Sequence, residues 1–330
     1  MSPPCPAGRL DGERDALLAP IRGPDTRRDL PQALFRRNGA AFLAKTGIAL
    51  GLLGLSWVVV AATPGPALTG LAIIVAGMMM AHLVELQHEC LHGHAFGSRR
   101  LDRWAGVACG LFMLSSHSHY RYGHLRHHAY LGTTANDEFF DYRFQGLNSP
   151  LGFLRGMYDM GRFPRLARDM ALSVAGRPLP GVAVPREAAR IRQEYRLYLA
   201  VLLAAVAASL ALGSWFLVLA WLVPLVAVAE PVHFLIEMPE HYGLDTQNEA
   251  DVLSNTRTIR AGAFARWLTN ANNLHTAHHY HQGVPMAGIR QLDAMISDRV
   301  RIVEPSYPAF YRKVISGRIS HNPDGSCMTR

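Results

Sequence analysis

The chain has 330 residues, of which 49% are hydrophobic and 18% are charged, and its formal net charge at pH 7 is +8. The charged residues gather in blocks and the apolar residues in long runs, which argues against a soluble protein and predicts membrane-spanning helices. Four cysteines, Cys5, Cys90, Cys109 and Cys327, show no repeated spacing, so we expect no disulfide framework.

The N-terminal region, residues 1–45, carries eight basic and five acidic residues and no long apolar run. It does not resemble a signal peptide, because the first hydrophobic segment begins late and lacks a small-residue cleavage site. Basic residues that flank a first membrane span are usual on the cytoplasmic side. We therefore interpret residues 1–45 as a cytoplasmic tail and expect no nucleic-acid partner.

Hydropathy predicts four spans that form two hairpins, since roughly 20 apolar residues cross a bilayer. The predicted spans are residues 46–62, 67–86, 195–212 and 215–236. Thr63-Pro-Gly-Pro66 links the first pair, and the fourth span is expected to bend at Pro224 or Pro231. The connections within the hairpins carry no charge, whereas the remaining segments are rich in arginine. The positive-inside rule then places both termini, including the C-terminal tail 286–330, in the cytoplasm.

Between the hairpins lies a basic segment, residues 98–196. Its apolar stretch Trp104–Leu114 is too short to span, so we expect a re-entrant or interfacial helix, with a buried helix of a soluble cap as the alternative. Arg162, Arg165 and Arg168 are interpreted as a solvated positive surface. Recognition of a phosphate-bearing carrier is the alternative for these arginines.

Three histidine-rich boxes give the strongest signal for function. They contain His88 and His92, then His124, His127 and His128, and then His275, His278 and His279. Residues three and four apart share one face of a helix, so each box can direct two or three imidazoles to a common point. Imidazole is a good ligand for iron, copper, zinc or nickel, and eight rings are too many for one ion. The spacing therefore predicts two metals.

Other histidines are given structural interpretations first. His82 lies within the second predicted span, where a hydrogen-bonded core histidine is the simpler expectation. Several more lie near the boxes but out of phase with them, and they are secondary candidates for ligands or ligand partners. These are His94, His117, His119, His233 and His281.

The order of the boxes, with two hairpins between them, resembles the membrane fatty acid desaturase family and its hydroxylase and ketolase relatives over about Thr46–Pro285. The resemblance implies an all-α integral membrane domain over residues 46–285, with four transmembrane helices and a cytoplasmic helical cap that holds a histidine-rich dimetal site. It also implies that the eight box histidines hold two irons and that O2 is a co-substrate. The family supplies one more ligand before the third box, a slot that His241 fits. Glu237, where some acyl desaturases have asparagine, is expected to bind the same iron directly or through water.

The expected activity is oxygen-dependent desaturation of a fatty-acyl or similar aliphatic chain, in the cytoplasmic membrane and in contact with lipid. Hydroxylation or ketone formation on a lipid or specialised metabolite is the alternative, because box spacing does not decide between these outcomes. A histidine-rich metal transporter is a remote alternative, since ionisable residues within the spans, such as His82, Glu230 and His233, lie near one surface. The sequence has no His-Pro-Gly-Gly signature of a fused haem-binding donor. We therefore expect a separate ferredoxin-like carrier with its reductase.

Overall fold

In the computed structural model the described residues are 30–62, 65–136, 146–158, 160–320 and 328–329. Most of the predicted N-terminal tail and residues 63–64 of the predicted first link lie outside this part of the chain. The described part is mostly helical, and its strands are only two residues long.

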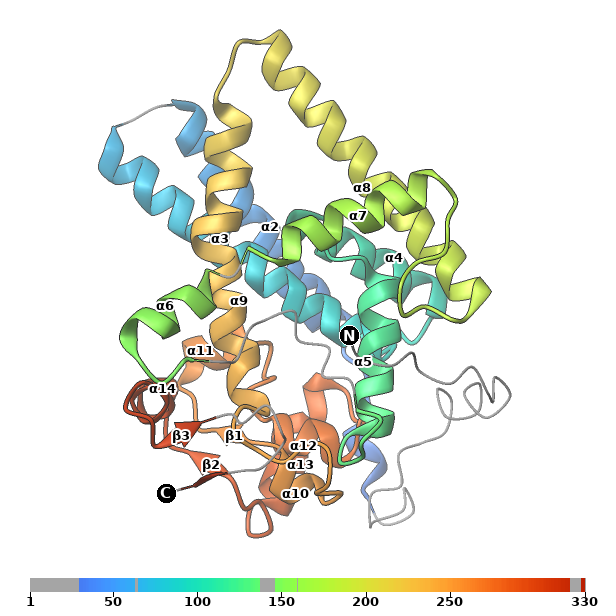
Figure 1. The fold of residues 1–330 in the computed structure, drawn as a ribbon, viewed down its shortest axis with the longest axis vertical. Coiled ribbons are helices and arrows are strands. Elements are labelled where there is room, and N and C mark those ends of the chain that lie inside the picture. Colours follow the sequence, from blue (N-terminus) through green and yellow to red (C-terminus); the bar gives the residue numbers. More distant parts are fainter. Residues whose placement is uncertain (1–29, 63–64, 137–145, 159, 321–327, 330) are drawn as a thin grey trace.

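Four long apolar helices form the frame of the molecule (Figure 1). They are α2 (Gly39–Ala62), α3 (Pro66–Leu91), α8 (Pro185–Ala211) and a helical run, Val218–Glu240, that contains α9 (Glu230–Glu237). Each is long and apolar enough to cross a bilayer. The protein is therefore a multi-pass membrane protein.

These helices are longer than the spans predicted from hydropathy. α2 begins at Gly39 instead of residue 46, and α3 continues to Leu91. The polar stretch Arg186–Arg196, most of which precedes the third predicted span, belongs to the first half of α8. Hydropathy detects only the apolar part of a helix, whereas backbone hydrogen bonding continues beyond that part. The extra turns matter because they carry polar side chains toward the histidines.

The fourth long helix passes through both of its prolines without ending. A π-helical turn precedes each proline, at η3 (Val218–Leu222) before Pro224 and at η4 (Leu225–Ala229) before Pro231. Proline has no N–H to donate and its ring crowds the preceding turn, so a wider turn relieves the clash. The distortion predicted at Pro224 or Pro231 thus takes the form of two π turns.

α3 packs against this helix at very short range. A Cβ atom added at Gly77 of α3 would lie 2.4 Å from Cβ of Val228 and 2.7 Å from the Pro224 carbonyl oxygen. Only glycine allows the two backbones to approach this closely. The contact fixes α3, which carries the first histidine box, against the helix that carries His233 and Glu237.

Shorter elements form a cap at one end of the long helices (Figure 1). Those before α8 are η1 (Gln32–Phe35), α4 (Arg99–Gly110), η2 (Leu111–Met113), α5 (His117–Tyr130), α6 (Pro150–Met157) and α7 (Arg162–Val174). Those after α9 are η5 (Met238–Glu240), α10 (Val252–Asn255), β1 (Thr258–Ile259), α11 (Ala263–Leu268), α12 (His275–Tyr280), α13 (Met286–Ile296), β2 (Val303–Glu304), α14 (Tyr307–Ile315), β3 (Ile319–Ser320) and β4 (Met328–Thr329). β1 pairs parallel to β2, and β3 pairs antiparallel to β4.

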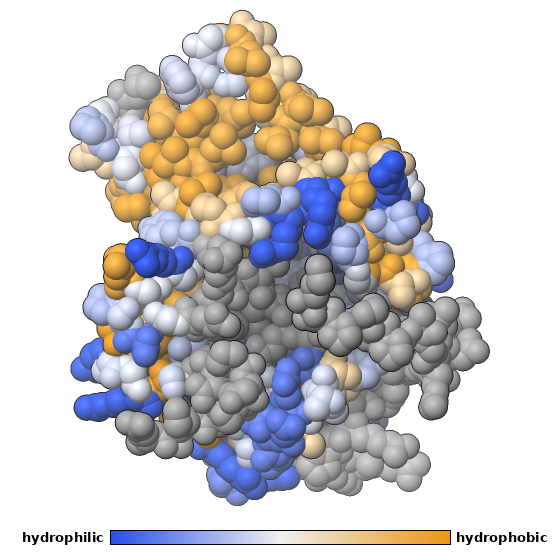
Figure 2. Space-filling model, in the orientation of Figure 1, coloured by the Kyte–Doolittle hydropathy of each residue, from blue (hydrophilic) through white to orange (hydrophobic). Residues whose placement is uncertain are grey.

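The surface of the molecule divides into an apolar part over the long helices and a polar part over the cap. Figure 2 shows hydrophobic residues gathered in the upper part of the view, over the long helices, and hydrophilic residues below, over the cap. Exposed apolar side chains on the long helices include Val58, Leu71 and Leu210. Large contiguous apolar surface on a folded protein marks contact with a membrane or a partner. The helices thus face lipid, and the cap faces water.

Candidate metal centre

The three boxes occupy helices that converge where the long helices meet the cap. His88 lies in the last turn of α3, and His92 follows as its C-cap residue. The second box lies on α5 and the third on α12, while His241 directly follows η5. Residues nearly 200 positions apart in the chain are therefore brought together at one site.

The nine imidazoles form two compact groups, and within each group the ligand atoms lie within 4.8 Å of one another. Group 1 contains His88, His92, His124, His128 and His278. Group 2 contains His127, His241, His275 and His279. The structure thus brings together all eight box histidines and His241, in the arrangement of a dimetal site.

Each triplet divides between the two groups. In α5, His124 and His128 join group 1 and His127 joins group 2. In α12 the pattern is reversed, with His278 in group 1 and His275 and His279 in group 2. Residues four apart on a helix are offset by about 40° and residues three apart by about 60° in the opposite sense. One triplet can therefore serve two neighbouring ions.

The distances between nitrogens test whether metals fit. In group 1, Nε2 of His124 lies 2.8 Å from Nε2 of His88 and 2.9 Å from those of His92 and His128. In group 2, Nε2 of His241 lies 3.1 Å from that of His127 and 3.0 Å from that of His275. Nitrogens at right angles around an ion, with bonds of roughly 2.1 Å, would be about 3 Å apart. The histidines therefore fit two metal ions.

Hydrogen-bond partners of the Nδ1 atoms orient two imidazole rings of group 2. The Nδ1–H of His241 donates to the Asn255 carbonyl at 2.9 Å, and Nδ1 of His127 lies 3.3 Å from Oδ1 of Asn136. Donation from Nδ1 leaves the Nε2 lone pair free to face an ion. These partners were not predicted, because sequence spacing does not show what lies behind a ring.

His275 has a carboxylate behind it. Its Nδ1 lies 3.4 Å from Oε1 of Glu240 and 3.3 Å from Oδ1 of Asn272, and the Asn272 amide donates to Glu240. A carboxylate behind a ligating imidazole fixes the ring and strengthens it as a donor. The only hint in the sequence was position, since Glu240 adjoins His241 and Asn272 precedes His275 by three residues.

Burial keeps the histidines neutral. It lowers the pKa of His127 to about 4 and brings those of His92, His124 and His278 well below their usual range, where neighbouring imidazoles lower them further. The pKa of His241 is likewise lowered by burial and by the charge of His127. Neutral imidazole is the form that binds a metal, so the site is prepared for cations at ordinary pH.

α8 anchors α5 through a buried carboxylate. Glu194, which is 0% exposed, accepts hydrogen bonds from the Ser118 backbone N–H at 2.8 Å, from the Ser118 hydroxyl at 2.6 Å and from the Ser116 hydroxyl at 2.8 Å. Nε of Arg103 lies 2.9 Å from the same carboxylate. Ser116 is the N-cap residue of α5, so Glu194 fixes the start of the helix that carries the second box.

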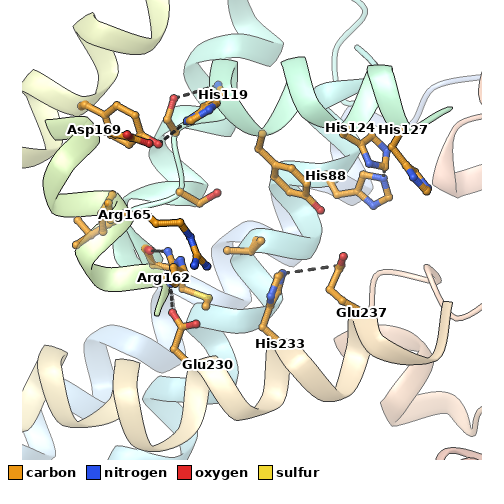
Figure 3. A pocket seen from close by; sticks show the side chains of 18 of the residues that line it. His88, His119, His124, His127, Arg162, Arg165, Asp169, Glu230, His233 and Glu237 are labelled. Carbon is orange, nitrogen blue, oxygen red and sulfur yellow. Dashed lines mark hydrogen bonds and ion pairs between the residues drawn. The ribbon is translucent and has the colours of Figure 1, made fainter. Parts of the chain in front are cut away.

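A cavity of about 280 Å³ reaches the centre. His88, His124, His127 and His275 line one end of it. Figure 3 shows the first three of these opposite Arg162, Arg165 and Glu230, with His233 and Glu237 on the α9 side. A substrate in this cavity would thus lie beside both histidine groups and among several polar groups.

One arginine of α7, Arg162, differs from its predicted surface role. Arg162 lines the cavity, its side chain is 16% exposed, and its guanidinium bonds to Glu230 and to the Met113 carbonyl. The prediction of a solvated surface is therefore wrong for Arg162. It was missed because its partner lies 68 residues away on α9. Arg168 is exposed and pairs with Asp169 at 3.0 Å.

Glu237 and His241 do not share a helical face. α9 ends at Glu237, and the tighter turn η5, which contains Pro239, changes the direction of the residues that follow. The imidazole of His241 joins group 2, whereas the Glu237 carboxylate lies with Glu85 and His233. Glu237 as a ligand of the His241 iron stays a prediction.

The histidines treated as secondary lie around the centre. Nδ1 of His82 donates to the Leu268 carbonyl at 2.8 Å, which confirms the hydrogen-bonded core histidine. His119 bonds to the Tyr195 hydroxyl at 2.7 Å and lines the cavity. His94 and His117 are buried, and burial lowers the pKa of each to about 3. Among these secondary candidates, only His233 belongs to a group of potential metal ligands in the described part of the chain.

Comparison with known proteins agrees with this geometry. Residues 64–311, more than half of the chain, match the family model described as fatty acid desaturase. The matched region contains all three boxes and His241. No curated protein matches the chain.

Proposed function

The chain belongs to the fatty acid desaturase family, whose members are diiron oxidoreductases, and on that premise we propose that it desaturates a fatty-acyl or similar aliphatic chain in an oxygen-dependent reaction. The observation that carries the proposal is the pair of histidine groups, of five and four ligands, at the end of one cavity. We propose that both ions are iron. A bound iron pair supplies the reduction of dioxygen and the oxidising power to take hydrogen from an unactivated carbon.

In the reaction, the protein binds the metal ions, positions the substrate carbon and excludes water. The nine imidazoles bind the cations in their neutral form, and Asn136, Asn255 and Glu240 fix three of the rings. The cavity holds the substrate carbon beside the histidines, because reaction requires close and oriented contact. Val84 and Leu114 contribute apolar walls to the same cavity and help to exclude water from the reacting carbon.

Hydroxylation or ketone formation on a lipid or specialised metabolite is the second candidate. The polar lining of the cavity favours a polar metabolite as its substrate. Arg162, Glu230, His233 and Glu237 all line the space beside the histidines. A purely hydrocarbon substrate would desolvate these groups without replacing their hydrogen bonds, which is costly. A substrate that carries a polar group would avoid this cost.

Product analysis tests the proposal and separates the two candidates. Lipids and small metabolites of a host that expresses the protein should contain a product two hydrogens lighter than its precursor. A product heavier by one oxygen would establish the second candidate. The His127→Ala variant, which removes a group 2 ligand, should give neither product. Equal products from the variant and the unaltered protein would contradict the role of the histidines.

Electrons are proposed to come from a separate ferredoxin-like carrier and its reductase. Purified protein with substrate and oxygen should then be idle until both are added. Turnover without them would mean that the substrate supplies every electron needed to reduce dioxygen, which would overturn this part of the proposal.

The cytoplasmic membrane, with both termini and the cap on the cytoplasmic side, is the proposed location. Arginine-rich segments such as α7 support this orientation. In a chain with Cys5→Ser and Cys327→Ser, Arg155→Cys should be labelled only from inside and Trp215→Cys only from outside. The opposite labelling pattern would reverse the topology.

A further inference from the structure

A third group of potential metal ligands lies beside the two histidine groups. It consists of Glu85 of α3 with His233 and Glu237 of α9, and one ligand atom of each lies within 4.8 Å of the others. We propose that these three side chains bind an additional divalent ion of the first transition series. The ion would be separate from the two irons, and its site goes beyond the proposed function.

The scaffold of this group is rigid. His233 and Glu237 stand four residues apart on α9 and share one face, with Nε2 and Oε1 separated by 3.8 Å (Figure 3). Glu85 reaches the group from α3, which packs against the fourth long helix through Gly77. Two helices in fixed contact therefore present the three ligands to one point.

Burial of the carboxylates is the second observation. Glu85 is 1% exposed and Glu237 is 5% exposed. Within the described residues, neither carboxylate oxygen of Glu85 has a hydrogen-bond partner of ordinary geometry, and the same is true of Oε1 of Glu237. A buried carboxylate without such partners is costly, and two carboxylates at close range repel each other. A bound cation would remove both penalties.

The neighbouring polar groups that could relieve the cost make their closest contacts elsewhere. Arg162 lines the same cavity but bonds to Glu230 and to the Met113 carbonyl. The Asn272 amide also reaches Glu85, but its closest contact is with Glu240, to which it donates at 2.5 Å. A metal ion would neutralise the charge that these groups leave uncompensated at Glu85 and Glu237.

The ligands indicate the class of ion. Two carboxylates would suit calcium or magnesium, but the imidazole of His233 favours a first-row transition ion. His233 and Glu237 also line the cavity. Coordination positions not filled by the protein would therefore face the space where a substrate binds.

Metal counting by equilibrium dialysis against Fe²⁺ without oxygen tests the site. The unaltered protein should bind three ions per chain, and the Glu85→Gln and His233→Gln variants should bind two. Glu230→Gln is the matched control, because Glu230 lies on the same face of the cavity, one turn before His233, and outside the group. That control should still bind three. Retention of two ions in a variant also shows that the histidine groups have folded.

Saturation of the unaltered protein at two ions would overturn the proposal and would mean that Glu85 and Glu237 share a proton instead. Three ions in the unaltered protein and in both variants would place the third ion elsewhere, which also overturns it. Each of these results leaves the diiron function intact if product still forms. Conversely, Glu85→Gln could bind one ion fewer while the unaltered protein forms no product. That pair of results would support the additional metal site and count against the proposed diiron function.

Discussion

Removal of the Glu194 carboxylate should loosen the helix that carries the second box. Three hydrogen bonds from Ser116 and Ser118 and the ion pair with Arg103 end on this side chain, which is 0% exposed. A hydrogen bond to a charged group contributes about 1.5–3 kcal/mol, and loss of one partner of a buried ion pair costs about 3–5 kcal/mol. These contacts share one carboxylate, so their energies do not add.

We therefore expect Glu194→Ala to lower the free energy of unfolding by about 3–5 kcal/mol. Glu194→Gln keeps the shape of the side chain but not its charge, and it should cost about 1.5–3 kcal/mol. Unfolding in detergent, followed by circular dichroism, measures both values. Because α5 carries three histidines of the two groups, the proposed iron binding should weaken in the same order.

Glu187→Gln is the control for this experiment. Glu187 lies on the same helix and pairs with Arg190 at 2.8 Å, three residues away, near the surface. Its loss should change stability by only about 0.3–0.5 kcal/mol. A Glu194→Ala protein that unfolds like this control and retains its iron would refute the anchoring role of Glu194.

Three further predictions concern ligands, pH and packing. His241→Ala should abolish activity with loss of one or both irons. Glu237→Gln should keep the two histidine-held irons and change the rate or the alkene-to-alcohol ratio. An unchanged rate and ratio would show that Glu237 has no role in the reaction. The histidine contribution to the thermal stability of the metal-free protein should fall as pH drops below about 6.5, because buried histidines such as His127, with a pKa of about 4, bind protons more readily when unfolded. Stability that does not change between pH 7 and pH 5 would contradict this burial. Gly77→Val should destabilise the protein by about 1–3 kcal/mol, since the new side chain meets Val228 and the Pro224 carbonyl; an unchanged melting temperature would refute the close packing.

Box spacing was sufficient to predict which histidines the fold brings together. The i, i+3, i+4 pattern on a helix constrains where rings can point, so it was predictable that His124, His127 and His128 would meet the other boxes. Which ring faces which ion was not predictable, because it depends on how α5 is rotated against α3 and α12. Hydropathy likewise gave the number of long helices but not their ends, since Glu194 lies in a polar part of α8 that hydropathy does not detect.

The hydrogen-bond partners in and around the site could not be predicted, because helical spacing does not show which side chains meet in the folded chain. Asn136 lies nine residues after His127 in a turn, and Glu230 meets Arg162 across 68 residues. Glu85 lies in the same segment as the first box, but nothing in its spacing indicates that α9 directs His233 and Glu237 toward it. Such contacts depend on tertiary packing, which one sequence without a structure does not supply.

Iron content per chain tests the central claim most directly. Glu85→Gln protein, which lacks a ligand of the additional site, should be loaded with iron without oxygen and compared with the unaltered protein by metal analysis. We predict that the variant holds two irons per chain, as the five and four histidines of the two groups require. A single ion per chain, or zinc that iron cannot replace with recovery of activity, would contradict the diiron account.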